Sequence, residues 1–285
     1  MSAAAAIRDP SARDELSPAN FRRLAELIQT YSGIKMPLGK RTMLEGRLRR
    51  RLRVVDCGTL DDYCHHLFVE GGLEAEIIHL IDAVTTNKTE FFREPAHFQL
   101  LQSTILPALA ETGRRKIKVW SAASSIGAEP YTLAMILEDH RQGPGRQDFS
   151  ILCTDLCTEV LAKTVAGVFP EAMIEPVEPA LRRRYLMRAE DASRRQVRIV
   201  PELRAKIAAA RLNLMDEHYP VDDDMDMVFC RNILIYFDKD TQAKVLDRLC
   251  RHIRPGGYLF LGHSESLVGV NLPVRQIGNS VFQKV

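Results

Sequence analysis

The sequence lacks any long hydrophobic run, and no stretch approaches 18 consecutive apolar residues. Its first residues, MSAAAAIRDPSARDE, also lack the apolar core of a signal peptide. Because they are small, polar and interrupted by proline, we expect residues 1–15 to form a disordered tail. These absences predict a cytoplasmic protein with no direct membrane insertion.

The sequence also lacks a strong charge of one sign and any metal-binding cysteine pattern. Its 39 basic and 37 acidic residues give a net charge of +2, which provides no overall field for nucleic acid. None of the six cysteines forms a CxxC pair or has a histidine at zinc-finger spacing, so we expect neither disulfides nor a metal site. Hydrophobic residues make up 46% of the chain, which is ample for a core.

Residues 16–84 are expected to form an N-terminal all-α domain because they carry the 3.6-residue helical period. Ser17-Pro18 is typical of a helix start, and Gly33 ends that helix. Three further helices are expected, beginning near Lys40 and at Thr59 and covering residues 73–84. Residues 85–115 are expected to form a linker.

Residues 116–285 alternate strand and helix, which predicts an α/β domain with a mostly parallel sheet. The expected core strands are 117–121, 149–153, 209–213, 226–230 and 258–262, with helices at about 130–140, 158–166 and 239–253. Pro255-Gly256-Gly257 predicts a tight turn, and Gly278-Asn279 predicts a closing hairpin. Residues 168–207 are too long for a structureless loop, so we expect an inserted subdomain made mainly of short antiparallel strands.

The segment KVWSAASSIGAEPYTLAMIL, residues 118–137, reads as a strand, a turn of small residues and a helix. Such a turn at the carboxyl end of a parallel strand is where open α/β sheets bind ligands. Gly127 is its only glycine, and Glu129 would repel a phosphate at the helix start. This pattern favours a cationic nucleoside such as S-adenosylmethionine, although Glu129 would also simply complement the helix dipole.

Polar residues follow three further strands at the same expected edge. Asp155 can accept both hydroxyls of a ribose, or it can cap the next helix. Asn213 and Leu214, at the end of the third strand, suit an adenine, and the fourth strand brings Arg231, Asn232 and Tyr236 to the edge. Four successive strand ends with a polar group indicate a ligand site.

Four segments together resemble the CheR family, the chemoreceptor glutamate methyltransferases. They are TTNKTEFFRE (85–94), VWSAASSIGAEPYT (119–132), CRNILIYFDKDTQ (230–242) and GGYLFLGHSESL (256–267). The resemblance runs in order from about residue 17 to the C-terminus. It implies a Rossmann-like S-adenosylmethionine-dependent methyltransferase domain with an inserted β-subdomain, preceded by a helical domain.

The resemblance also implies an activity: transfer of a methyl group from S-adenosyl-L-methionine to receptor glutamates, giving glutamate methyl ester and S-adenosyl-L-homocysteine. Its implied cofactor contacts, beginning in the segment 85–115, are Asn87, Thr89, Arg93, Glu129, Asp155, Asn213, Leu214, Arg231 and Asn232. Arg93 and Tyr236 are the groups that the family places close to the transferring methyl. From the residues alone, Arg93 would otherwise close a helix TEFFREPAHF, and Tyr236 would be a packing aromatic.

The chain departs from the family pattern at two places. Family members commonly read Ser-Thr-Gly-Glu-Glu-Pro in the ligand turn, whereas Ile126 and Ala128 replace a hydroxyl and a carboxylate here. The insertion lacks the glycines of members that dock on a receptor's C-terminal pentapeptide, so pentapeptide tethering is not expected. Nothing in the sequence requires more than a monomer.

Residues 40–53 carry an excess of positive charge that favours an acidic partner. Seven basic residues, Lys40, Arg41, Arg47, Arg49, Arg50, Arg51 and Arg53, stand against the single acid Glu45. We expect this helix to contact the glutamate-rich methylation helices of chemoreceptors. A solvated helix face or a nucleic-acid partner would give the same charge pattern.

Two other functions stay open at this point. A nucleic-acid methyltransferase would typically carry an Asn/Asp-Pro-Pro-aromatic sequence where this chain has CRNILIYF, and Cys230 lacks the preceding proline of cytosine-C5 enzymes. A non-catalytic receptor-binding module is favoured only by the altered turn SSIGAEP.

Overall fold

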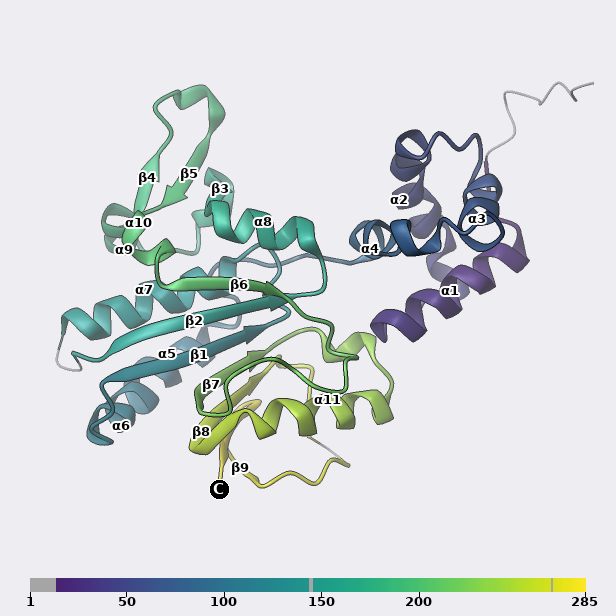
Figure 1. The fold of residues 1–285 in the computed structure, drawn as a ribbon. Helices are drawn as coiled ribbons and strands as arrows, with labels where there is room; N and C mark the ends of the chain where they lie inside the picture. Colours follow the sequence, from purple (N-terminus) through teal and green to yellow (C-terminus); the bar gives the residue numbers. More distant parts are fainter. Residues whose placement is uncertain (1–13, 144–145, 268) are drawn as a thin grey trace, which may run out of the picture. The chain divides into compact units, whose positions relative to one another are not determined.

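The structure is a computed structural model that describes residues 14–143, 146–267 and 269–285. The chain divides into two compact units, one ending at Thr85 and the other beginning at Thr86 (Figure 1). Most of the expected tail, residues 1–13, lies outside the described residues. Its last two residues make contacts: the Asp14 carboxylate accepts from the Leu60 amide at 3.1 Å, and Glu15 pairs with Arg41.

From residue 14 onward, the first unit contains four α-helices: α1 (Pro18–Ser32), α2 (Arg41–Val54), α3 (Leu60–Phe68) and α4 (Leu73–Val84). The Ser17 hydroxyl caps α1 and Gly33 ends it at φ 75°, as the sequence predicts. Thr59 caps α3 in the same way. The apolar faces form one core, whose fully buried members include Leu24, Ile28, Leu44, Leu48, Leu60, Tyr63 and Leu80.

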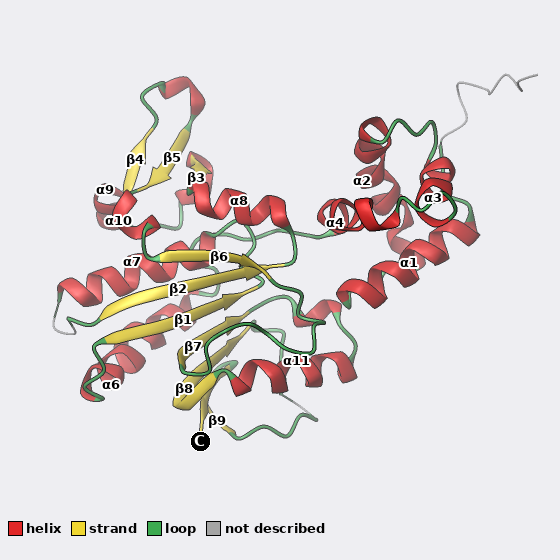
Figure 2. Ribbon diagram, in the orientation of Figure 1, coloured by secondary structure: helices red, strands yellow, loops and turns green. Residues whose placement is uncertain are grey.

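The second unit is built on a seven-stranded sheet with the order β6-β2-β1-β7-β8-β10-β9 (Figure 2). The strands are β1 (Lys116–Ala122), β2 (Asp148–Asp155), β6 (Ile207–Arg211), β7 (Met225–Cys230), β8 (Ile253–Leu261), β9 (Val274–Gly278) and β10 (Val281–Lys284). The first five in sheet order are parallel, and β9 and β10 form the predicted antiparallel hairpin at the edge. The fold therefore has the expected α/β class.

Three helices connect the parallel strands: α7 (Ala128–Gln142), α8 (Thr158–Ala166) and α11 (Lys239–Arg251). Starting from β1, the chain first adds β2 and then β6 on one side of the sheet. It then adds β7 and β8 on the other side of β1. Right-handed crossovers consequently put α7 and α8 on one face and α11 on the other. The reversal leaves the carboxyl ends of β1 and β7 side by side, which is the position where such sheets bind ligands.

Residues 95–111, expected as linker, are helical. They form α5 (Pro95–Leu100), a π-helical turn η2 (Leu101–Ile105) and α6 (Leu106–Glu111). Pro107 lacks the amide hydrogen that a regular α-helix needs at this point, which accounts for the wider turn before it. Only the last four residues of the expected helix TEFFREPAHF are helical, as the start of α5, because Phe92 (φ 54°) and Glu94 (φ 59°) take left-handed conformations that interrupt an α-helix.

Two further boundaries differ from the prediction. The third core strand is Ile207–Arg211 rather than 209–213, so Asn213 and Leu214 follow the strand instead of ending it. Pro255-Gly256-Gly257 lies inside β8, where the pairing with β7 is irregular and Met225 and Met227 pair with Ile253 and Tyr258. The expected tight turn is a strand irregularity.

The insertion contains the predicted antiparallel sheet, with the order β3-β5-β4. Its strands are β3 (Val168–Pro170), β4 (Leu186–Arg188) and β5 (Gln196–Ile199). Helical segments that the sequence analysis did not predict join them: η3 (Glu171–Ile174), α9 (Pro179–Tyr185), η4 (Ala192–Arg194) and α10 (Pro201–Arg204). Each α-helix begins at a proline, whose missing amide hydrogen is not needed at that position.

All six cysteines are free thiols, five of them buried. Among the described residues, no helix combines the length and the apolar composition that a membrane crossing requires.

Candidate functional site at the carboxyl edge of the sheet

The turn after β1 has an unusual backbone. Ala123 (φ 58°), Ser125 (φ 53°) and Gly127 (φ 95°) all take positive φ. A Cβ at Gly127 would lie 3.0 Å from the Thr164 side chain, so close packing against α8 requires the glycine. The Thr164 hydroxyl donates to the Ser125 carbonyl at 3.0 Å. The turn is therefore held in one conformation, with its backbone close to the sheet edge.

Asp155, at the end of β2, fixes the same turn. Its carboxylate accepts hydrogen bonds from the Ser125 amide at 2.8 Å and from the Cys157 amide at 2.9 Å. The residue that caps α8 is Cys157, so Asp155 does not occupy the capping position considered from the sequence. A carboxylate at this strand end, beside a small-residue turn, fits the hydroxyls of a ribose.

Glu129 lies in the first turn of α7 and is tied to two neighbouring strands. Its carboxylate accepts from the Ser121 hydroxyl at 2.7 Å and pairs with the Arg231 guanidinium at 3.0 Å. Arg231 comes from the end of β7, and its side chain is only 3% exposed. The glutamate that the sequence singles out is thus ion-paired within the protein as well as placed at the helix start.

Arg231 also binds a second carboxylate, that of Glu94. The guanidinium lies 2.9 Å from Glu94 Oε2 and donates to the Arg93 carbonyl. Burial alone would raise the pKa of Glu94, but hydrogen bonds from Asn232 and Arg231 and the charge of Arg231 lower it to about 2. Glu94 is therefore an anion at neutral pH, and the two carboxylates together hold one buried arginine.

Asn232 and Glu265 join the ends of β7 and β8. Asn232 takes φ 61°, and its side-chain amide donates to Glu94 Oε1 at 3.0 Å. Glu265 accepts from the amides of Asn232 and Leu234, at 3.0 and 2.7 Å. A Cβ at Gly262 would lie 2.5 Å from the Asn232 side chain, so the glycine of GHSE is needed for this close approach.

The remaining predicted site residues lie around the same edge. Ser125 Oγ donates to the Asn87 carbonyl at 3.0 Å, and Arg93 donates to the Lys88 carbonyl at 3.3 Å. Arg93 is half-buried in the turn before α5, and Thr89 is also half-buried. The network therefore includes the segment before α5.

Asn213, Leu214 and Tyr236 lie after the outer and central strands. Asn213 Oδ1 accepts from the Met215 amide at 3.0 Å and so shapes its own turn, while Leu214 is 7% exposed. The Leu212 amide donates to the Asp155 carbonyl at 3.0 Å, which links this turn to β2. Tyr236 ends the short helix η5 (Leu234–Tyr236) and is half-buried.

Several members of this network were not predicted: Ser121, Glu94 and Glu265. Glu94 and Glu265 do lie inside the segments TTNKTEFFRE and GGYLFLGHSESL that carried the resemblance, but the partners that join them to this network, Arg231 and Asn232, are more than 30 residues away. Ser124 Oγ is buried without a hydrogen-bond partner within the described protein. An orphaned hydroxyl in a turn of small residues fits a polar ligand at this edge.

Comparison with known proteins agrees with the resemblance to the CheR family. Residues 19–85 match the all-alpha domain of the CheR methyltransferases, and residues 87–282 match their SAM-binding domain. The chain is 40% identical to the chemotaxis protein methyltransferase of Salmonella typhimurium, with 94% of this chain and 90% of that protein covered. It is 39% identical to that of Escherichia coli, with 94% and 91% covered.

A third relative is chemotaxis protein methyltransferase 2 of Pseudomonas aeruginosa, at 35% identity over 92% of each chain. The sequence resemblance, the α/β sheet with its inserted antiparallel sheet and both domain matches agree. The chain belongs to the CheR methyltransferase family.

Proposed function

We propose that this protein methylates glutamate side chains of chemoreceptors, using S-adenosyl-L-methionine as methyl donor. The products are glutamate methyl ester and S-adenosyl-L-homocysteine. The observation that carries the proposal is Glu129 at the start of α7, held by Ser121 and Arg231 beside the turn after β1. A fixed carboxylate there suits the positive charge of this cofactor and disfavours a phosphate.

The proposed cofactor contacts are those implied by the family. They are Asn87, Thr89, Arg93, Glu129, Asp155, Asn213, Leu214, Arg231 and Asn232. Asp155 would accept the ribose hydroxyls, and Glu129 the ammonium group. Arg231 and Asn232 contribute chiefly by positioning, because their polar groups hold Glu129 and Glu94.

The proposed reaction needs little acid or base catalysis by the protein. A glutamate has an ordinary pKa of about 4.3, so the receptor carboxylate is already ionised at neutral pH. When bound, the cofactor supplies an electrophilic methyl group. The protein's task is to exclude water and to hold the carboxylate in line, which can contribute roughly 7–11 kcal/mol. Arg93 and Tyr236 are proposed to orient the reactants by geometry.

Two substitutions separate these roles. Arg93→Ala is expected to reduce transfer more than it weakens cofactor binding, and Tyr236→Phe to reduce transfer with binding unchanged. If Tyr236→Phe keeps the wild-type rate while Arg93→Ala abolishes transfer without weakening binding, Arg93 alone orients the nucleophile. Calorimetry with S-adenosylmethionine and S-adenosylhomocysteine provides the binding measurement, and absence of binding by the pure protein would overturn the proposed function.

The substrate side is proposed to be α2. Four of its arginines make contacts within the first unit: Arg41 with Glu45, Arg47 with the Thr85 carbonyl, Arg49 with the Asp14 carbonyl and Arg51 with Glu76. Arg50 and Arg53 are exposed and have no such contact among the described residues. These two would meet the acidic methylation helices. The proposal further takes the protein to be a cytoplasmic monomer without pentapeptide tethering.

The two other functions have less support. Cys230, considered for cytosine chemistry, is completely buried, and burial raises the pKa of its thiol well above the ordinary value. Such a thiol is not a nucleophile. A non-catalytic module would not need the ion-paired Glu129 or the orphaned Ser124 hydroxyl.

A further inference from the structure

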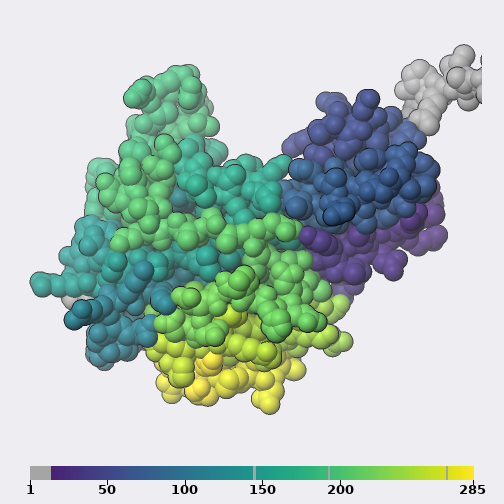
Figure 3. Space-filling model, in the orientation of Figure 1, coloured from purple at the N-terminus to yellow at the C-terminus, as the bar shows by residue number. Residues whose placement is uncertain are grey.

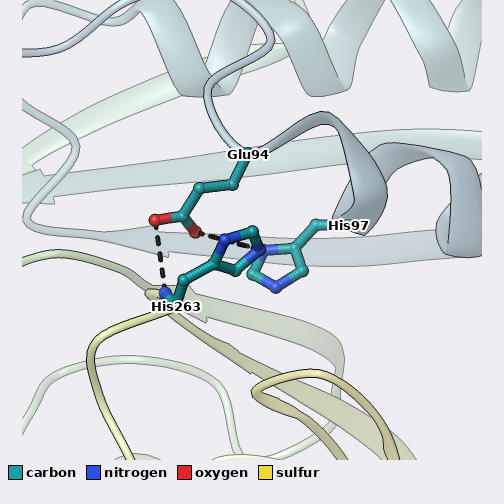
Figure 4. Close-up of side chains that lie close together, drawn as sticks. All are labelled: Glu94, His97 and His263. Atoms are coloured by element: carbon teal, nitrogen blue, oxygen red, sulfur yellow. Dashed lines mark hydrogen bonds and ion pairs between the residues drawn. The ribbon is translucent and has the colours of Figure 1, made fainter.

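Glu94, which belongs to the Arg231 network, also forms a cluster with His97 and His263, two residues that the proposed reaction does not use. One ligand atom from each lies within 4.8 Å of the other two (Figure 4). Glu94 and His97 come from the start of α5, and His263 follows β8. We propose that this cluster binds a divalent transition-metal ion, with Zn²⁺ as the best match.

The first argument is the orientation of the His97 ring. Its Nε2 lies 2.9 Å from the Asn279 carbonyl, which can only accept, so Nε2 carries the proton. Nδ1 is then a lone pair, and it is buried without a hydrogen-bond partner.

That lone pair faces another acceptor. His97 Nδ1 lies 3.6 Å from Glu94 Oε2, which is too long for a hydrogen bond. Because His97 is only 2% exposed, bulk water does not satisfy Nδ1. A cation between the two atoms would give the Nδ1 lone pair a partner and would share Glu94 Oε2 with Arg231.

The spacing matches a tetrahedral ion. Ligands bound to zinc at about 2.1 Å lie roughly 3.4 Å apart when the geometry is tetrahedral. The two distances to Glu94 Oε2 are 3.6 Å from His97 Nδ1 and 3.9 Å from His263 Nε2. The three ligand atoms lie within 4.8 Å of one another, so binding requires His263 to move closer to its partners. Its side chain is 39% exposed, which leaves it room to move. The exposure also leaves an entry path and a fourth position for water.

The surroundings orient the ligands as they do in known zinc sites. A ligating histidine usually donates its other ring N–H to a carbonyl or carboxylate. For His97, the acceptor is the Asn279 carbonyl. Glu94 Oε1 is held by the Asn232 side chain at 3.0 Å and the His263 amide at 3.2 Å. These bonds leave Oε2 directed at the two rings.

The positive charge of Arg231 would repel a bound cation, because its guanidinium lies 2.9 Å from the same Glu94 Oε2. It is shared with Glu129, so the two carboxylates and one guanidinium carry a net charge of −1. A cation is therefore electrostatically acceptable. Two imidazoles and one carboxylate suit Zn²⁺ or Ni²⁺, whereas Mg²⁺ and Ca²⁺ prefer oxygen ligands alone.

The test uses the untagged full-length protein after removal of metal with a chelator. Zn²⁺ is titrated by calorimetry, and Co²⁺ is titrated by visible absorption, which reports tetrahedral coordination. We expect one ion per chain and a rise in the thermal unfolding midpoint on loading. His263→Gln should weaken binding at least tenfold, and His97→Gln and Glu94→Gln should do the same.

The matched control is His66→Gln. His66 Nδ1, on α3, lies 3.1 Å from the carboxylate of the exposed Glu70, so this pair reports adventitious binding of metal to a histidine and a carboxylate near the surface. The control should bind like the wild type. The proposal is overturned if Zn²⁺ does not bind, or if His263→Gln, with an unchanged circular dichroism spectrum, binds as tightly as the wild type. Equal weakening by His66→Gln would also overturn it. Methyl transfer is not part of the readout, so the outcome is independent of the proposed function.

Discussion

Arg231 and Glu129 form an ion pair of 3.0 Å that joins the end of β7 to the first turn of α7. Arg231 is nearly fully buried, and its other amino group binds Glu94 at 2.9 Å. The carboxylate proposed to meet the cofactor is thus part of a three-residue network. Its position depends on segments that are far apart in the sequence.

Removing Arg231 is expected to destabilise the second unit strongly. Arg231→Met leaves Glu94 and Glu129, whose side chains are each 13% exposed, without their guanidinium partner. This should lower the free energy of unfolding by about 3–5 kcal/mol. Chemical denaturation measures this. The control is Arg194→Met, because Arg194 and its partner Asp191 are 70% and 59% exposed and should contribute less than about 1 kcal/mol. Equal losses in both variants would contradict the account.

Glu129→Gln is expected to weaken binding of S-adenosylmethionine, because it removes the negative charge at the start of α7. We expect a loss of about tenfold or more, by analogy with hydrogen bonds to charged groups worth roughly 1.5–3 kcal/mol. Glu159 stands at the equivalent place in the first turn of α8 and is exposed. Glu159→Gln should bind the cofactor like the wild type in the same calorimetric titration. If both substitutions weaken binding to a similar extent, the effect comes from the overall charge of the protein and not from the position of Glu129.

Gly127→Ala is expected to disturb the turn after β1 in two ways. The residue has φ 95°, and the new Cβ would lie 3.0 Å from Thr164. Strain of this kind costs about 1–3 kcal/mol. Gly113 also has a positive φ, of 72°, but nothing lies within 4 Å of its Cβ position. Gly113→Ala should therefore cost less in thermal unfolding, and only Gly127→Ala should weaken cofactor binding.

Reversing the exposed charge of α2 is expected to impair recognition of receptors. The double variant Arg50→Glu and Arg53→Glu should lower the rate of receptor methylation at low salt, with a smaller difference at high salt because the attraction is screened. Both side chains are exposed, so stability should not change. Arg22→Glu, on the exposed side of α1, is the control. An unchanged methylation rate for the double variant would remove α2 from the docking proposal.

The stability of the first unit is expected to depend on pH through the Asp61 carboxylate. Burial alone would raise its pKa, but hydrogen bonds from Asn20 and Ser17 lower it below the ordinary value. The stability that the carboxylate contributes is therefore present above about pH 4 and is lost as the pH falls through the lower folded-state value. Asp61→Asn should be less stable than the wild type at pH 6, and this difference should shrink in acid unfolding experiments. Glu26→Gln, an exposed change on α1, should behave like the wild type throughout.

The sequence predicted the elements that follow from local periodicity and capping. The limits of α4 and α8 were correct. Gly33 ends α1 and Thr59 caps α3 as predicted, because capping signals act within a few residues. The Arg231–Glu94 pair was not predicted, because its partners are 137 residues apart. The left-handed conformations of Phe92 and Glu94 were also missed, since non-glycine residues give no local signal for them.

The measurement that tests the central claim most directly uses methyl-labelled S-adenosylmethionine with chemoreceptor fragments and the purified protein. The account predicts that label enters the receptor and that mild base releases it as methanol, which identifies a carboxyl methyl ester. Label that stays on the receptor after base treatment, label found in nucleic acid, or no transfer by protein that binds the cofactor would contradict it.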